Sequence, residues 1–167
     1  MTPETIVPVP EKQKTSPKDV FLHLLAILTL YGSGVSFGAL LFNHIDIWMP
    51  DRLQDMYWAR ESAFNAIRFS IASLIIVFPV YLLTTRFLNK TYFENPSRRN
   101  MRIRKWLVYF TVFATALVII GDLVSLVYNL LGGEVTARFL LKTLTVFFVA
   151  GSIFFYYFWD LKTHKTE

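Results

Sequence analysis

The chain has 167 residues, of which 54% are hydrophobic and 17% aromatic, with a formal net charge of +5 and a mean hydropathy of +0.42. This composition excludes an ordinary soluble domain of the same length, which would need far more polar residues to cover its core. The absence of cysteine excludes disulfides, thiolate nucleophiles, iron–sulfur clusters and zinc–thiolate sites.

The apolar residues fall in four blocks, near residues 19–43, 62–88, 104–131 and 136–161. Each block exceeds the length of about 20 residues that a helix needs to cross about 30 Å of hydrocarbon. The first block is too long for a signal-peptide core and no small-residue cleavage site follows it, so we expect it to remain as a span. The sequence therefore predicts an all-α integral membrane protein, a bundle of four transmembrane helices.

The basic residues predict the orientation of these helices. Twelve of the 17 lysines and arginines lie in the N-terminal tail, in the second connection, taken as residues 86–105, or in the C-terminal tail. They are Lys12, Lys14, Lys18, Arg86, Lys90, Arg98, Arg99, Arg102, Arg104, Lys105, Lys162 and Lys165. Because cations remain on the cytoplasmic side during insertion, both termini and the 86–105 connection are expected there.

Capping signals predict where two helices begin. Ser16 followed by Pro17 and Asp19 has the pattern of an N-cap, a proline at the first helical position and an acid in the first turn. Asn95-Pro96 repeats the cap and the proline, without the acid, before the third block. We therefore expect the third helix to begin in the cytoplasm and to carry the arginines on its first turns.

The remaining segments complete the predicted organisation. Residues 50–60, which follow a proline, are expected to form a short helix along the outer interface. Residues 1–15 are expected to be a flexible cytoplasmic tail, 16–161 the membrane domain, and 162–167 a second cytoplasmic tail.

Three ionisable residues lie inside the predicted spans. Arg68, Asp122 and Lys142 belong to the second, third and fourth blocks, and each lies about 9–14 Å below the outer end of its helix. A charge in hydrocarbon costs at least about 2.5 kcal/mol, so these side chains are expected to face one another. The role expected of Asp122 is to pair with Arg68, Lys142 or both.

Helical spacing extends each charge into a polar stripe. The stripes are Glu61, Asn65 and Arg68 on the second helix; Asp122, Ser125 and Asn129 on the third; and Arg138, Lys142 and Thr145 on the fourth. All members of the three stripes except Thr145 are candidate binding residues.

Three interpretations of the stripes remain open. The first is a structural ion-pair network that fixes the register of the helices, although polar contacts between membrane helices are often worth only about 0.6 kcal/mol. The second is an outward-open cavity for an anion or a lipid head group, because cations outnumber carboxylates there. The third is a proton or ion path, but the inner halves of the third and fourth helices carry no ionisable side chain beyond tyrosine.

Small residues and one proline are candidates for helix packing. Gly34 and Gly38 are four residues apart, a spacing that lets another backbone approach closely, either within the bundle or from a second copy. Pro79 is expected to kink the second helix.

No catalytic motif, cofactor site or metal site is predicted. The chain has no H-E-x-x-H, G-x-S-x-G or phosphate-binding glycine loop. His23 and His44 lie near opposite ends of the first block and His164 in the tail, so they offer no axial pair for haem. We expect neither enzyme activity nor a cofactor.

The basic segment 98–105 is expected to act mainly as a topology determinant. Its attraction to anionic lipid, about 1 kcal/mol for each cation near the surface, follows from that position. Membrane lipids are therefore expected partners, whereas nucleic acid is not.

The stretch SPKDVFLHLLAILTLYGSGVSFGALLFNHID, followed by an acidic and aromatic connection and three more apolar blocks, resembles a bacterial family known only as a domain of unknown function. The resemblance covers residues 16 to about 160 and implies a short four-span protein of a bacterial inner membrane. It implies no activity, cofactor or catalytic residue.

Two functional hypotheses follow. In the first, the chain is a structural, accessory or scaffolding subunit that packs on a second copy or on another membrane protein. In the second, it is a small unit that binds or transports an anionic ligand through an outward-open polar cavity.

Overall fold

The computed structural model describes residues 16–50, 56–94, 101–133 and 135–163. They form four helices and, within these ranges, no strand: α1 (Pro17–Trp48), α2 (Met56–Glu94), α3 (Arg102–Gly132) and α4 (Ala137–Thr163). All four are long and apolar enough to cross a membrane. The all-α architecture expected from the four apolar blocks is confirmed.

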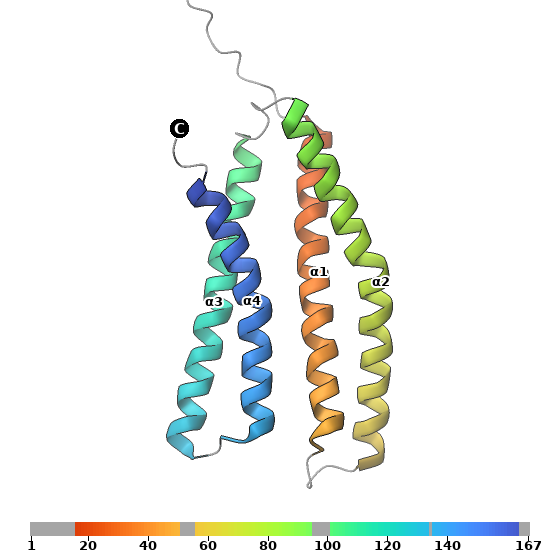
Figure 1. Cartoon of the computed structure of the whole chain (residues 1–167), viewed down its shortest axis with the longest axis vertical. Coiled ribbons are helices and arrows are strands. Elements are labelled where there is room, and N and C mark those ends of the chain that lie inside the picture. The colour runs from red at the N-terminus through yellow and green to blue at the C-terminus, as the bar shows by residue number, and fades with distance from the viewer. Residues whose placement is uncertain (1–15, 51–55, 95–100, 134, 164–167) are drawn as a thin grey trace, which may run out of the picture.

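The helices form two antiparallel hairpins, α1 with α2 and α3 with α4 (Figure 1). We call the end where α1 leads to α2 and α3 leads to α4 the hairpin end, and the opposite end, where α1 begins and α4 finishes, the terminal end. Helix α1 is central because it packs on each of the other three helices. Within the described residues, no Cα atom of α2 comes within 8 Å of α3 or α4. The bundle is therefore open, with α2 on its edge.

The helix starts agree in part with the capping signals. Ser16 is the N-cap of α1 and Pro17 its first residue, although the Ser16 side chain makes no capping hydrogen bond. Helix α3 begins at Arg102 with Met101 as its N-cap, and the start expected at Asn95-Pro96 lies outside the described residues. Its arginines do occupy the first turn, as expected.

The predicted interfacial helix is also revised. Residues 56–60 belong to the first turns of α2, and residues 51–55 lie outside the described part of the chain. The 1–15 tail lies outside it as well, as do residues 164–167 of the second tail, whereas Lys162 and Thr163 are still helical in α4.

Pro79 and the glycines of α1 have different roles in packing. Helix α2 contains Pro79, which removes one backbone hydrogen bond, and it changes direction part of the way along its length (Figure 1). A Cβ atom at Gly32 would lie 3.3 Å from Val77 on α2, and one at Gly34 would lie 3.3 Å from Ile153 on α4. The absence of a side chain at these two positions therefore lets α1 approach both neighbours.

Gly38 does not share this role. Apart from the backbone of its own helix, a Cβ atom there would meet no described atom within 4 Å, so of the two contacts considered for Gly38 the one within the bundle is not formed among the described residues.

The best-buried side chains are small hydroxyl residues rather than large apolar ones. Thr111 on α3 is fully buried, and its hydroxyl donates to the Leu107 carbonyl over 2.9 Å. The Thr115 hydroxyl donates to the Thr111 carbonyl over 2.8 Å in the same way. Because each hydroxyl is satisfied by its own helix, these residues permit close packing without an unpaired polar atom. Large apolar side chains such as Phe69 and Phe113 point outward instead.

Candidate functional site

One carboxylate joins the two hairpins at the hairpin end. Asp46, in the last turn of α1, accepts a hydrogen bond from Arg138 Nε over 2.8 Å, and its Oδ1 forms an ion pair with Arg138 Nη2 at 2.7 Å. The same Oδ1 atom lies 2.6 Å from Lys142 Nζ. Arg138 and Lys142 lie one turn apart at the start of α4, so both reach the end of α1 from one face. All three side chains are partly exposed, at 24–28%.

This ion-pair cluster borders an open cavity of about 570 Å³ between α1, α2 and α4, which we call the hairpin-end cavity. Its charged lining residues are Asp46, Arg60, Arg138 and Lys142, joined by the amide of Asn43 and the hydroxyl of Ser62. Among these lining residues, three cations face a single carboxylate. The cavity therefore has the electrostatic character of an anion site, with guanidinium groups suited to a phosphate or a carboxylate.

The structure brings together two of the predicted site residues, Arg138 and Lys142, but with a partner that had not been predicted. Asp46 had been placed in the connection after the first span, which was expected to end near residue 43. Helix α1 continues to Trp48, and this extension puts Asp46 on a helical turn opposite α4. A signal was present in the sequence, since Asn43 and Asp46 have the i, i+3 spacing of a shared helical face.

The stripe on the second helix does not join the site. Glu61, Asn65 and Arg68 are all exposed, and Arg68 Nη1 is 3.5 Å from Asn65 Oδ1 on its own helix. Arg68 is turned toward its own helix, and no Cα atom of α2 lies within 8 Å of α3 among the described residues, so the expected meeting of Arg68 with Asp122 is not formed there.

The stripe on the third helix is also separate from Lys142. Asp122 is partly buried, and within the described residues its Oδ2 atom is enclosed without a hydrogen-bond partner. Asn129 donates to the Ser125 carbonyl of the same helix over 2.8 Å. The expected pair with Lys142 fails because of depth: Asp122 lies about 15 Å from the end of α3, whereas Lys142 lies about 8 Å from the start of α4 and extends toward Asp46.

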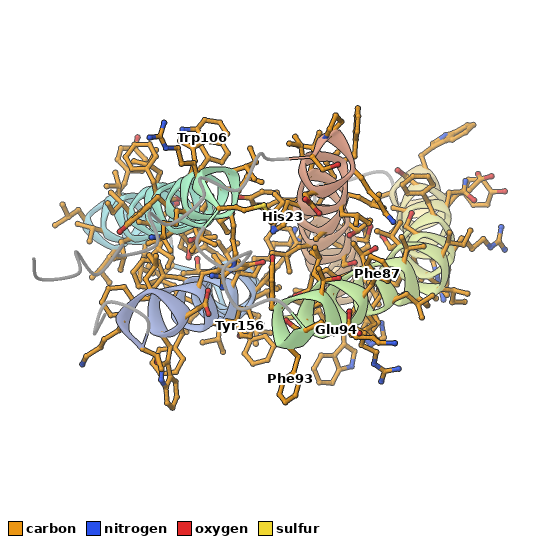
Figure 2. All side chains as sticks on the ribbon, turned by 90° about the horizontal axis from the view of Figure 1, so that it is seen from above. His23, Phe87, Phe93, Glu94, Trp106 and Tyr156 are labelled. Atoms are coloured by element: carbon orange, nitrogen blue, oxygen red, sulfur yellow. The ribbon has the colours of Figure 1, made fainter. Side chains whose placement is uncertain are left out.

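A second polar cluster, which the sequence analysis did not predict, lies at the terminal end. His23 is only 5% exposed; its Nδ1 is 2.6 Å from the Asp19 carbonyl oxygen, and its Nε2 is hydrogen-bonded to the Tyr92 hydroxyl. Arg104 on α3 donates to Asp160 on α4 over 2.5 Å, and its guanidinium lies 5.4 Å from the centre of the Tyr92 ring. Figure 2 shows His23 on the side of α1 that faces the other hairpin.

The two hairpins are therefore linked at both ends. The terminal-end cluster borders a cavity of about 290 Å³, the terminal-end cavity, which residues of all four helices line. No single stretch of sequence could reveal this cluster, because His23 and Tyr92 are 69 residues apart and Arg104 and Asp160 are 56 apart. Among the described residues, no group of three or more His, Asp or Glu side chains could hold a metal ion.

These features define an all-α protein made of two apolar hairpins, with a polar cluster joining them at each end. The sequence matches the family described as domain of unknown function DUF5671 over residues 19–157, and the chain belongs to this family. The resemblance to an uncharacterised family is thereby confirmed. No curated protein and no solved structure gives a significant match.

Proposed function

We propose that this chain is a multi-pass membrane protein that binds an anionic group, a phosphate or a carboxylate, in the hairpin-end cavity. The observation that carries the proposal is that, among the described residues, three cations and one carboxylate line an open cavity of about 570 Å³. The four apolar helices support insertion in a membrane. The distribution of basic residues supports cytoplasmic termini, so the hairpin end would face outward, as in a protein of a bacterial inner membrane.

The geometry favours reversible binding over a purely structural role for these charges. Asp46 forms ion pairs with both Arg138 and Lys142, and because it carries a single negative charge, it neutralises only part of their positive charge. Arg60 of α2 adds a third cation to the cavity lining. Arg60 lies over the ring of Phe64, with 5.7 Å to the ring centre, and Lys142 lies over Phe42 at 5.4 Å. These contacts hold both cations at the wall and leave them able to attract an anion.

The source of the anion is either a lipid head group or a small solute, and one experiment separates them. Purified protein in an uncharged detergent is titrated with inorganic phosphate and with a short-chain phosphatidic acid while its melting temperature is recorded. Stabilisation by both probes indicates a general anion site, and stabilisation by the lipid alone indicates a head-group site.

The matched variants are Arg60→Gln and Arg86→Gln. Both arginines are exposed on α2, but only Arg60 lines the hairpin-end cavity. Arg60→Gln is expected to weaken binding several-fold, whereas Arg86→Gln leaves it unchanged. Equal effects of the two variants, or no stabilisation by either probe, would contradict the proposal.

A structural or accessory role is the second candidate, and a separate observation favours it. Gly38 has no described atom within 4 Å of the position of its missing Cβ, although it lies four residues from the closely packed Gly34. A helix of a second copy or of another membrane protein could approach α1 there. The test is the Gly38→Leu experiment described in the Discussion.

A further inference from the structure

Two cavities adjoin one another along the same helices. The terminal-end cavity is bounded by α1, α2, α3 and α4, and next to it lies an apolar groove of about 480 Å³ between α1, α2 and α4. Tyr81 lines both. On α1 the lining passes from Ile27 to Leu30, and on α4 from Tyr156 to Ile153, about one helical turn in each case. The polar terminal-end cavity, called the chamber below, thus continues into the apolar groove, called the groove below. A site of this form suits a molecule with a polar head and an apolar tail.

The charges of the chamber are balanced. Arg104 is paired with Asp160 over 2.5 Å. Because a carbonyl oxygen can only accept, His23 donates from Nδ1 to Asp19 and, when neutral, accepts from the Tyr92 hydroxyl at Nε2. The chamber therefore differs from the hairpin-end cavity, where cations are in excess. A neutral head group fits it better than a phosphate.

Several residues in the walls of the chamber carry aromatic rings. Its ring-bearing lining residues are His23, Tyr81, Tyr92, Tyr156 and Tyr157. The Tyr156 and Tyr157 rings meet edge to face with 5.1 Å between centres, and the Tyr81 hydroxyl lies within hydrogen-bonding reach of Thr85 and Tyr157. Such walls stack against a flat ring, and phenol hydroxyls can donate to carbonyl oxygens on its edge.

The groove supplies the apolar half of the site. Its lining includes Phe37, Phe78, Phe148 and Val149, and Phe78 and Phe148 are 46% and 63% exposed. The Ser33 hydroxyl in this lining is buried and has no hydrogen-bond partner among the described residues, and the Ser152 hydroxyl donates to the Phe148 carbonyl of its own helix. A hydrocarbon chain entering from the bilayer would cover these residues.

We propose that the chamber and the groove together bind a neutral isoprenoid quinone, with the ring in the chamber and the isoprenoid chain in the groove. A quinone combines a flat uncharged ring, carbonyl acceptors on its edge and a single hydrocarbon tail. This site is separate from the hairpin-end cavity and does not rest on the anion proposal.

Binding is measured by quenching of tryptophan fluorescence and by thermal melting of the full chain in detergent. The probes are decylubiquinone and a tailless dimethoxy-dimethylbenzoquinone. Decylubiquinone is expected to bind more tightly than the tailless ring. Dioleoylglycerol, which is neutral but not aromatic, serves as competitor, as does a short-chain phosphatidic acid; neither is expected to displace the quinone.

Two variants separate the head site from the tail site. Ser152→Phe places a ring in the groove at an exposed position. It is expected to weaken decylubiquinone binding about tenfold, because about two methylene groups of the tail would no longer fit in the groove. Binding of the tailless quinone is expected to stay unchanged. Ala72→Phe adds the same ring to an exposed position of α2 outside both linings and is the matched control. Tyr156→Phe removes a hydroxyl of the chamber lining that, unlike that of Tyr92, is not committed to His23, and is expected to weaken both quinones about threefold to tenfold, the range given by one hydrogen bond.

Several results would overturn the proposal. Equal affinity for the two quinones, or equal effects of Ser152→Phe and Ala72→Phe, would remove the groove from the site. If phosphatidic acid or dioleoylglycerol displaced bound decylubiquinone at a concentration lower than that of the quinone itself, the site would be a lipid site instead. Should Ser152→Phe fail to fold, the comparison of the tailed and tailless probes on the unmodified chain decides by itself.

Discussion

Asp46 and Arg138 are 92 residues apart in the sequence, yet both Nε and Nη2 of the arginine lie within 2.8 Å of one carboxylate oxygen. This contact joins the end of α1 to the start of α4 and therefore links the two hairpins beside the hairpin-end cavity. The same carboxylate sets the charge of that cavity, so its removal should change stability and anion binding in opposite directions.

Asp46→Asn is expected to lower the free energy of unfolding by about 1–2 kcal/mol, between the values for exposed and for buried pairs, because the three side chains are only partly covered. It should also tighten phosphate binding by about fivefold to tenfold, because the substitution removes a repulsion of about 1 kcal/mol between the carboxylate and the phosphate. Melting curves with and without phosphate measure both effects.

The double variant Asp46→Asn with Lys142→Gln provides the control. It removes one charge of each sign, so it should recover part of the stability lost in Asp46→Asn but none of the phosphate affinity gained. If Asp46→Asn lost stability and phosphate did not restore it, the cluster would be a structural clamp and not an anion site.

The orientation can be tested by labelling single cysteines in intact cells with an impermeant reagent. With both termini in the cytoplasm, cysteines at Thr163 and Ser97 should stay unlabelled until the cells are opened, whereas one at Gln54 should react at once. The chain has no native cysteine, so background labelling is absent. Immediate labelling at Thr163 would reverse the assignment of the hairpin end to the outside.

The number and order of the helices could be predicted from the sequence because each apolar block is longer than a membrane is thick. The partners of the polar residues could not. Periodicity shows which residues share a face, as it did for Arg138 and Lys142, but it does not show which helix that face meets. This assumption places Arg68 in the site, but its side chain is exposed, turns toward Asn65 of its own helix and does not line the hairpin-end cavity.

Helix length accounts for the other errors. The first span was expected to end near residue 43, five residues before the end of α1 at Trp48, and Asp46 was therefore counted as part of a loop. The terminal-end cluster was missed for a different reason. His23 was judged only as one member of an axial pair of histidines, whereas its partner in the fold is a tyrosine on α2.

Gly34 and Gly38 should respond differently to leucine, although they lie four residues apart on one helix. At Gly34 a Cβ atom would lie 3.3 Å from Ile153 and 3.6 Å from Val149, so leucine should separate α1 from α4 and cost about 1–3 kcal/mol. At Gly38 nothing lies within 4 Å among the described residues, so leucine should leave the melting temperature of the isolated chain unchanged.

Crosslinking in the membrane shows whether Gly38 contacts a partner. Gly38→Leu should reduce crosslinking to a second copy or to another protein, whereas Gly151→Leu, at a second helical glycine with nothing within 4 Å, serves as the control. Identical crosslinking in the two variants would exclude an accessory role through this face of α1.

Asp122 provides the last test, because its surroundings are unlike those of Asp46. Its Oδ2 atom is enclosed on a helix of high apolar content and has no hydrogen-bond partner in the described residues. A carboxylate in such a position is costly, and an amide of the same shape costs less because it carries no charge. Asp122→Asn is therefore expected to raise the melting temperature of the isolated chain or leave it unchanged, whereas Asp46→Asn lowers it. A matched variant is Asn129→Asp, which adds a carboxylate two turns along the same stripe and should destabilise. If Asp122→Asn instead lowered the melting temperature as much as Asp46→Asn, Asp122 would have a stabilising cation partner, which would contradict the enclosed, unpaired Oδ2 atom.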